Sequence, residues 1–180
     1  MISPVGLRPM RLSDLDAVKA LEAQAYSHAW SRGNFADSLA SGYLAELLSV
    51  ADGQLLGYFV VMPGVDELHL LNVTVAPEHQ SRGLGSQLMQ AVFEHGARLG
   101  MSLLWLEVRK SNLRAQSLYR RLGFAEVAVR AAYYPAGPQR EDAVVMRRPL
   151  GRATAVAALA EPDAEWALAS TEPASLSRLP

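Results

Sequence analysis

Apolar residues in the first half of the chain follow two different spacings. In residues 13–25 they recur every three or four positions, which predicts a helix beginning at Ser13-Asp14. Ser31 is an N-cap candidate for a second, shorter helix that ends near Gly42. The apolar runs that follow are separated by Asp-Gly and Pro-Gly turn signals, so we expect an antiparallel meander. Predicted strands cover residues 5–10 at the start of the chain, then 43–50, 54–62 and 67–76.

The second half of the chain alternates between helices and strands. One predicted helix ends at Gly100 and carries a single stripe of side chains, and a shorter one covers residues 112–122. A strand-helix-strand crossover within a largely antiparallel sheet implies an α/β (α+β) domain, with a mixed sheet flanked by helices. The stripe of the first helix comprises Leu84, Leu88, Val92, His95 and Leu99. The remaining predicted strands cover residues 103–109, 124–130 and 142–148.

The composition changes after residue 150. Residues 1–150 form one predicted domain, whereas residues 151–180 are rich in Ala, Ser and Pro and show no sustained periodicity. We expect this tail to be mostly disordered. The alternative is a docking segment that uses Trp166.

Composition also excludes several classes of function. The chain of 180 residues contains no cysteine, so disulfides, thiolate metal sites and a cysteine nucleophile are ruled out. Its four histidines lack metal-ligand spacing, so no metal site is expected. A net charge of -1 gives no global attraction to nucleic acid or to anionic membranes. No signal peptide or membrane-spanning run is recognisable, and the expected location is cytoplasmic.

The segment Gln80–Ser86 contains the main candidate binding motif. It follows a predicted strand and opens a helix, with glycines at Gly83 and Gly85. The first amides of a helix have no partners within the helix, and glycine allows close approach to the backbone, so the turn suits an anion such as a pyrophosphate. A phosphate loop that hydrolyses ATP would need a Lys-Ser/Thr pair where Ser86-Gln87 stands. A dinucleotide turn would need a third glycine in place of Leu88.

Two side chains downstream are candidates for acid-base chemistry. Glu107 lies in the strand 103–109, where alternation places it beside Trp105 and opposite Leu106. A carboxylate in such a strand suits a general base, and the alternative is a structural ion pair with Arg109 or another arginine. Tyr119 lies on the apolar stripe of the helix 112–122, as either a core tyrosine or a proton donor to a departing thiolate. Asn112 is expected to cap that helix or to bind a ligand amide.

These motifs together resemble the GNAT acetyltransferases, and within them the RimI group that acetylates the N-terminal alanine of a small-subunit ribosomal protein. The resemblance covers roughly residues 5–150 and departs from the group at Ser81, where a basic residue is common, and in the added tail. It is carried by residues 80–85, 105–112, 118–124, 133–135 and 141–143, and more weakly by 29–31 and Phe35.

The resemblance implies acetyl-CoA as the acetyl donor and a protein N-terminus as the acceptor. It makes Glu107 the general base and Tyr119 the general acid, and it places Tyr134 and Trp30 at the acceptor peptide. The implied coenzyme-binding residues are Val73, Thr74, Val75, Ser81, Arg82, Gly83, Leu84, Gly85, Ser86 and Asn112.

Other functions remain open at this level. The protein is expected to acetylate the alanine of a ribosomal protein, other N-termini or a small amine, or to bind the coenzyme without turnover. A nucleic-acid site is the least favoured, because its basic cluster has no stacking aromatic motif. That cluster comprises Arg109, Lys110, Arg114, Arg120 and Arg121. The sequence does not indicate the oligomeric state.

Overall fold

A single seven-stranded sheet organises the described chain. The computed structural model describes residues 5–151, and the predicted disorder of the tail lies outside them apart from Gly151. The strand order is β1-β2-β3-β4-β5-β7-β6, and every neighbouring pair is antiparallel except β4 and β5. The predicted mixed, mostly antiparallel sheet is therefore confirmed. The strands are β1 (Val5–Pro9), β2 (Leu44–Val50), β3 (Leu55–Pro63), β4 (Glu67–Val75), β5 (Leu103–Arg109), β6 (Ala125–Ala136) and β7 (Gln139–Pro149).

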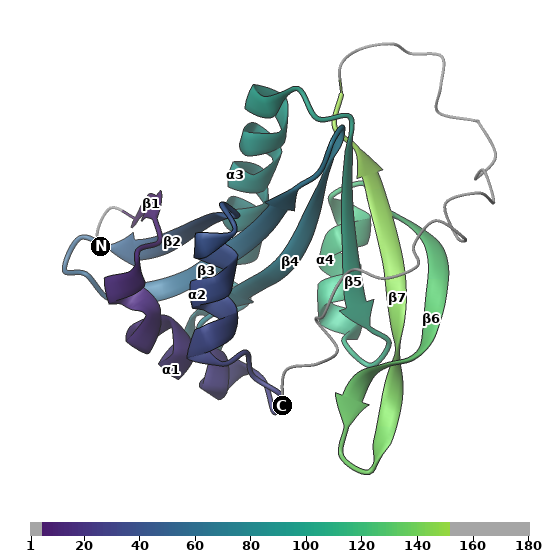
Figure 1. Cartoon of the computed structure of the whole chain (residues 1–180), viewed down its shortest axis with the longest axis horizontal. Helices are drawn as coiled ribbons and strands as arrows, with labels where there is room; N and C mark the ends of the chain where they lie inside the picture. The colour runs from purple at the N-terminus through teal and green to yellow at the C-terminus, as the bar shows by residue number, and fades with distance from the viewer. Residues whose placement is uncertain (1–4, 152–180) are drawn as a thin grey trace.

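Helices cover the two faces of the sheet unevenly (Figure 1). Helices α1 and α2 pack on one face of β2–β4, and α3 and α4 pack on the other face. On the first face, Figure 1 shows no described helix over β5–β7. The helices are α1 (Leu15–Ala25), α2 (Arg32–Ala40), α3 (Leu84–Leu99) and α4 (Leu113–Arg121), with short 3-10 turns η1 (Leu12–Asp14) and η2 (Pro77–His79).

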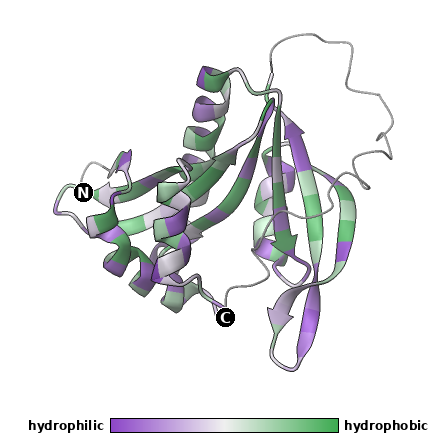
Figure 2. Ribbon diagram, in the orientation of Figure 1, coloured by the Kyte–Doolittle hydropathy of each residue, from purple (hydrophilic) through white to green (hydrophobic). Residues whose placement is uncertain are grey.

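The hydrophobic core is divided by the sheet. Leu15, Val18 and Phe35 pack against Tyr58 and Val60 on the α1–α2 side. The larger cluster, on the α3–α4 side, is built by the alternate residues of β3, β4, β5 and β7 with α3. Figure 2 shows the hydrophobic positions gathered in the central strands, and hydrophilic ones at the far end of the β6–β7 hairpin. The core includes Phe59, Leu68, Leu88, Met89, Val92, Leu104 and Met146.

Two predictions differ from the structure in detail. The stripe of α3 is turned relative to expectation: Leu88 and Val92 are buried, but Leu99 is 49% exposed because it ends the helix beyond the edge of the core. The last hairpin is longer than predicted, since β6 continues to Ala136 and β7 begins at Gln139. A bulge interrupts the period of two in β6, so the alternation of apolar residues does not predict its second half.

Candidate active site

Strands β4 and β5 separate halfway along their length. Their parallel pairing runs only from Glu67 and Leu103 to Leu70 and Leu106. Leu71 is an extra residue in β4, since Val60 and Val61 of β3 pair with Asn72 and Leu70. Such a bulge bends a strand and increases its twist. We call the separated segments, residues 71–75 of β4 and 107–109 of β5, the strand split (Figure 1).

On the β4 side of the strand split, side chains from other elements donate hydrogen bonds to main-chain carbonyl groups. The Tyr26 hydroxyl, just after α1, donates to the Val73 carbonyl oxygen at 3.1 Å. The Gln80 side-chain amide donates to the Val75 carbonyl oxygen at 3.0 Å. In a strand the N–H and C=O of one residue point to the same side, so the amides of Val73 and Val75 also face the strand split.

The β5 side is arranged in the same way. The Tyr134 hydroxyl donates to the Glu107 carbonyl oxygen at 3.0 Å. The buried Gln116 side chain of α4 donates to the Arg109 carbonyl oxygen at 3.0 Å, and the Asn112 amide does so at 2.9 Å. Helix α4 is therefore attached to β5 at the open end of the strand split.

The glycine turn begins α3 at this same end. Gly83 is the N-cap and has φ 83°, a left-handed conformation that favours glycine. A Cβ at Gly85 would lie 3.2 Å from Leu118 Cδ2, so glycine allows α3 and α4 to approach closely. Amides in the first turn of α3 have no intrahelical partners and lie at the positive end of the helix dipole. The turn therefore presents unpartnered main-chain amides beside a glycine, and its role as an anion site stays a prediction.

Arg114 of α4 fixes the residues before that turn. Its guanidinium donates to the Gln80 side-chain oxygen at 2.7 Å and also to the Ser81 hydroxyl. Ser81 itself has a positive φ of 63°, which is uncommon for a residue other than glycine. Arg82 is exposed beside it. The Ser81 hydroxyl is thus engaged by Arg114, whereas Arg82 is the basic side chain at the surface of the turn.

Glu107 lies on the open face of β5. The predicted alternation is observed, with Leu104, Leu106 and Val108 buried and Trp105 and Glu107 on the other face. Glu107 Oε1 is 3.1 Å from Arg130 Nη1, and the two side chains are 30% and 32% exposed. The structure therefore contains the arginine ion pair that the sequence left open, with Arg130 as the partner. Arg109 instead pairs with Glu141 at 3.1 Å.

A bulge in β6 directs two consecutive tyrosines toward Glu107. Between Arg130 and Tyr134, three residues of β6 stand opposite a single residue of β7. Within this bulge Ala132 has a φ of 51°, and its amide donates to the Asp142 carboxylate at 3.0 Å. The Tyr133 hydroxyl lies 3.4 Å from Glu107 Oε2, in addition to the contact of Tyr134 with the Glu107 carbonyl. Arg109 stacks over the Tyr134 ring at 4.5 Å.

Tyr119 lies inside the larger core cluster. Its side chain is 6% exposed, and its ring centroid is 5.7 Å from that of Phe124. Burial raises the pKa of Tyr119, and Tyr26 and Tyr134 raise it further. The phenol therefore stays protonated near neutral pH and has its electrostatic neighbours on both sides of the strand split. Asn112 caps α4 through a hydrogen bond from the Ala115 amide at 3.1 Å, so the expected cap is confirmed.

Thr74 and Trp30 both donate hydrogen bonds to a buried carboxylate. Glu22 is 2% exposed and accepts hydrogen bonds from the Tyr58 and Thr74 hydroxyls, the Asn72 side chain and the Trp30 amide. The Thr74 side chain consequently points into the core, away from the strand split. The Trp30 ring is half-buried, with its centroid 5.3 Å from that of Phe35.

Several residues of this region belong to no motif of the sequence. Glu22 was visible as a charged residue on the apolar stripe of its helix, which is a usable signal for a buried network. Arg130 and Tyr26 had no such signal, because each reaches its partner through a fold that brings distant segments together. The basic cluster is engaged within the protein: Arg114 as above, Arg109 with Glu141, Lys110 with Asp142, Arg120 with Glu126 and Arg121 with Ser117.

Residues 5–151 hold no cluster of three or more His, Cys, Asp or Glu side chains placed to bind a metal ion. No helix in the same range is long and apolar enough to cross a membrane.

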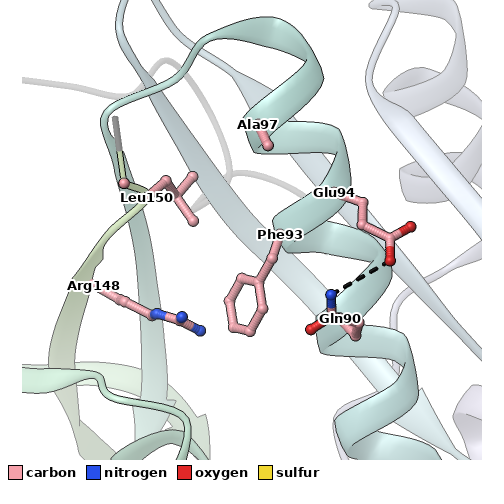
Figure 3. Close-up of a pocket in the computed structure, with 7 residues that line it drawn as sticks. Gln90, Phe93, Glu94, Ala97, Arg148 and Leu150 are labelled. Atoms are coloured by element: carbon pink, nitrogen blue, oxygen red, sulfur yellow. Dashed lines mark hydrogen bonds between the residues drawn. The ribbon is translucent and has the colours of Figure 1, made fainter. Parts of the chain in front are cut away.

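A shallow pocket lies on the opposite face of the sheet from Glu107 (Figure 3). It has a volume of about 240 Å³ and lies between α3 and the end of β7. Arg148 points across it, with its guanidinium carbon 3.9 Å from the centre of the Phe93 ring. Arg148 pairs with Leu104 in the sheet and Glu107 with Val145, and neighbouring positions alternate between faces. This pocket is therefore separate from the strand split.

The turn, the strand split and the carboxylate together suit an enzyme that transfers a group from an anionic donor. The profile of the Acetyltransferase (GNAT) family matches residues 15–124. The chain belongs to the GNAT acetyltransferase family.

Relatives and solved structures agree with this assignment. The [ribosomal protein bS18]-alanine N-acetyltransferase of Escherichia coli K12 is 36% identical over 78% of this chain and 95% of its own length. The crystal structure of the ribosomal-protein-S18-alanine N-acetyltransferase from Escherichia coli superposes with a TM-score of 0.78 at 33% identity, covering 85% of this chain and 98% of that one. A spermidine N-acetyltransferase SpeG chimera from Vibrio cholerae and hSSAT shares the fold, with a TM-score of 0.71 at 19% identity and coverage of 82% of this chain and 96% of that one.

Proposed function

We propose that this protein transfers the acetyl group of acetyl-CoA to the N-terminal α-amino group of a protein, namely the N-terminal alanine of ribosomal protein bS18. The observation that carries the proposal is the 36% identity to an enzyme named for that reaction, over 95% of that enzyme's length. The glycine turn, Glu107 and Tyr119 support the proposal as the candidate donor site, base and proton donor. A ribosomal acceptor places the reaction in the cytoplasm.

The donor site consists of the glycine turn and the strand split. The amides of residues 81–86, with Arg82 beside them, suit the pyrophosphate, since Gly83 and Gly85 leave the backbone accessible. The amides of Val73 and Val75 face the strand split, where they suit the amide-bearing arm of the coenzyme. Thr74 supports this strand from the core side. When bound, acetyl-CoA supplies an activated acyl thioester.

Glu107 is the proposed general base. An α-amino group with a pKa near 8 is about one-tenth neutral at pH 7, whereas a lysine near 10.4 is less than about 0.1% neutral. A single carboxylate acting through water therefore has a smaller free-energy cost of deprotonation to overcome if the acceptor is an N-terminus than if it is a lysine. Within residues 5–151, Glu107 Oε2 has a long hydrogen bond from the Tyr133 hydroxyl at 3.4 Å, and we assign this oxygen to receive the proton. Since the chain has no cysteine, the amine attacks the thioester directly.

Tyr119 is the proposed general acid for the departing thiolate. Burial keeps its phenol protonated, and it lies in the last turn of α4, the helix that Asn112 caps. Asn112 uses its side-chain oxygen for the cap, so the amide group of that side chain is the part left for the coenzyme. The proposed acceptor contacts are Tyr134, which borders Glu107, and the exposed part of the Trp30 ring.

Release of free thiol tests turnover directly. The protein is incubated with acetyl-CoA and a peptide that carries the bS18 N-terminus, and thiol is measured against a control without peptide. The proposal predicts peptide-dependent thiol release that falls at least about 100-fold in Glu107→Gln, while acetyl-CoA affinity stays the same. Coenzyme binding without peptide-dependent thiol release would instead identify a non-catalytic binding domain.

A further inference from the structure

Glu107 is not a free carboxylate in this protein, because a cation stands beside it. Arg130 Nη1 lies 3.1 Å from Glu107 Oε1, and about one third of each side chain is exposed. Among the ion pairs of the described residues, Arg130 takes part only in this one. Its guanidinium carbon also lies 5.5 Å from the centre of the Tyr133 ring. The proposed base and its cation thus lie together on the open face of the sheet.

The position of Arg130 is built into the backbone. Arg130 is the last residue of β6 before the bulge and pairs there with Ala143 of β7. The bulge is held by Asp142, which accepts from the Ala132 amide at 3.0 Å and pairs with Lys110 at 3.3 Å. Arg130 therefore reaches across β7 to the strand that carries Glu107. The main chain therefore fixes where the Arg130 side chain begins, and the ion pair with Glu107 holds its guanidinium.

The other charged groups on this face of the described sheet contact partners other than Glu107. Arg109 pairs with Glu141 and stacks on Tyr134. Arg147 lies over the Trp105 ring at 5.6 Å. Farther along β4, Glu67 lies 2.8 Å from His69 and accepts from the Trp105 indole at 2.7 Å. Arg130 is therefore the cation that offsets the charge of Glu107.

We propose that Arg130 is a specificity-determining residue, which makes the site selective for amines that arrive uncharged. This inference rests on the proposed function. An ammonium group approaching Glu107 meets a carboxylate that is already neutralised, and it is repelled by the guanidinium beside it. A neutral amine meets no such repulsion. Because α-amines are neutral far more often than lysines or polyamines near pH 7, Arg130 favours a protein N-terminus.

The fold alone does not determine which class of amine is acetylated. The same architecture occurs in a spermidine N-acetyltransferase at 19% identity, so the class of acceptor has to be set by side chains. A charge that is one third exposed is partly screened by water, which limits its effect on acceptor choice to about fivefold.

The test compares Arg130→Met, which removes the charge but keeps an unbranched side chain, with Arg130→Lys, which keeps the charge. Two peptides serve as acceptors at pH 7.5: one begins with alanine and has no lysine, and the other has a blocked N-terminus and one lysine. The ratio of kcat/KM for the two peptides and the inhibition constant of spermidine are measured. Acetyl-CoA affinity and Tm establish that each variant is folded.

We expect Arg130→Met to lower the alanine-to-lysine ratio by about fivefold and to tighten spermidine inhibition by a similar factor. Arg130→Lys is expected to keep both values near those of the unchanged protein. An equal loss on both peptides with unchanged spermidine inhibition would overturn the proposal, because Arg130 would then only orient Glu107. If the unchanged protein fails to acetylate the alanine peptide, the proposed function fails instead, and spermidine inhibition still reports on Arg130.

Discussion

The Tyr134 hydroxyl donates a hydrogen bond to the main-chain carbonyl oxygen of Glu107 at 3.0 Å. Tyr133, its neighbour in the chain, reaches the Glu107 side chain from the same direction. In a regular strand these two tyrosines would point to opposite faces of the sheet. The bulge in β6 brings both to one residue, and it thereby links the β6–β7 hairpin to the strand that carries the proposed base.

Replacing Tyr134 with Phe removes this link and keeps the ring under Arg109. A hydrogen bond of this kind contributes about 1 kcal/mol net, so we expect kcat/KM for the alanine peptide to fall roughly fivefold. The affinity for acetyl-CoA, measured by calorimetry, is expected to stay the same, because the glycine turn is untouched. Tyr133→Phe is the matched control and should have a smaller effect, since its contact is longer. A larger loss in Tyr133→Phe than in Tyr134→Phe would contradict this ranking.

Tyr119 gives a prediction about pH. Burial raises its pKa above the ordinary value for tyrosine, so the phenol should remain protonated throughout the neutral and mildly alkaline range. We expect kcat of Tyr119→Phe to be about 100-fold lower. The ratio of the two rates should stay constant between about pH 7 and 9.5, because no phenol deprotonates there. A ratio that declines toward one within this interval would show that Tyr119 loses its proton there and would contradict the raised pKa. A ratio near one at every pH would exclude Tyr119 as the acid. Loss of folding without a loss of rate per folded molecule would make it a core tyrosine.

Gly83 and Gly53 form a matched pair of turn glycines. Their φ values are 83° and 90°, and a Cβ at either one would meet no atom within 4 Å. Alanine should therefore cost about 1–2 kcal/mol of unfolding free energy at each, through backbone strain alone. Only Gly83→Ala is expected to weaken acetyl-CoA binding, because Gly83 caps α3 whereas Gly53 lies in the β2–β3 turn. Equal acetyl-CoA affinities in the two variants would show that the glycine turn is not part of the donor site.

Glu22 supports the β4 side of the strand split from the core. Glu22→Ala removes the acceptor of four hydrogen bonds, and within the described chain only Thr74 has another acceptor nearby, in Asn72, so we expect a loss of about 3 kcal/mol in unfolding free energy. Asp16 on the same helix is the control, since its exposed pair with Arg32 should contribute less than about 1 kcal/mol. Urea denaturation of both variants measures the difference. Similar losses at the two positions would argue against the buried network.

Periodicity predicted the order of the elements well, because most strands bury alternate residues and most helices bury a stripe. It placed Leu106 and Glu107 on opposite faces of β5 and Asn112 at a helix cap, and the structure has both. It missed the second half of β6, where the bulge breaks the alternation. Side chains that meet through long-range pairing, such as Arg130 with Glu107, leave no local trace in the sequence. The roles of Glu107, Tyr119 and the coenzyme-binding residues stay predictions.

Mass spectrometry of a competition reaction tests the central claim most directly. Equal amounts of two peptides are incubated with the full chain and acetyl-CoA, one beginning with alanine and lacking lysine, the other with a blocked N-terminus and a single lysine. Fragmentation then locates the acetyl group. The account predicts early and nearly exclusive acetylation of the α-amine of the alanine peptide. Preferential modification of the lysine peptide, or of neither peptide while acetyl-CoA binds normally, would contradict it.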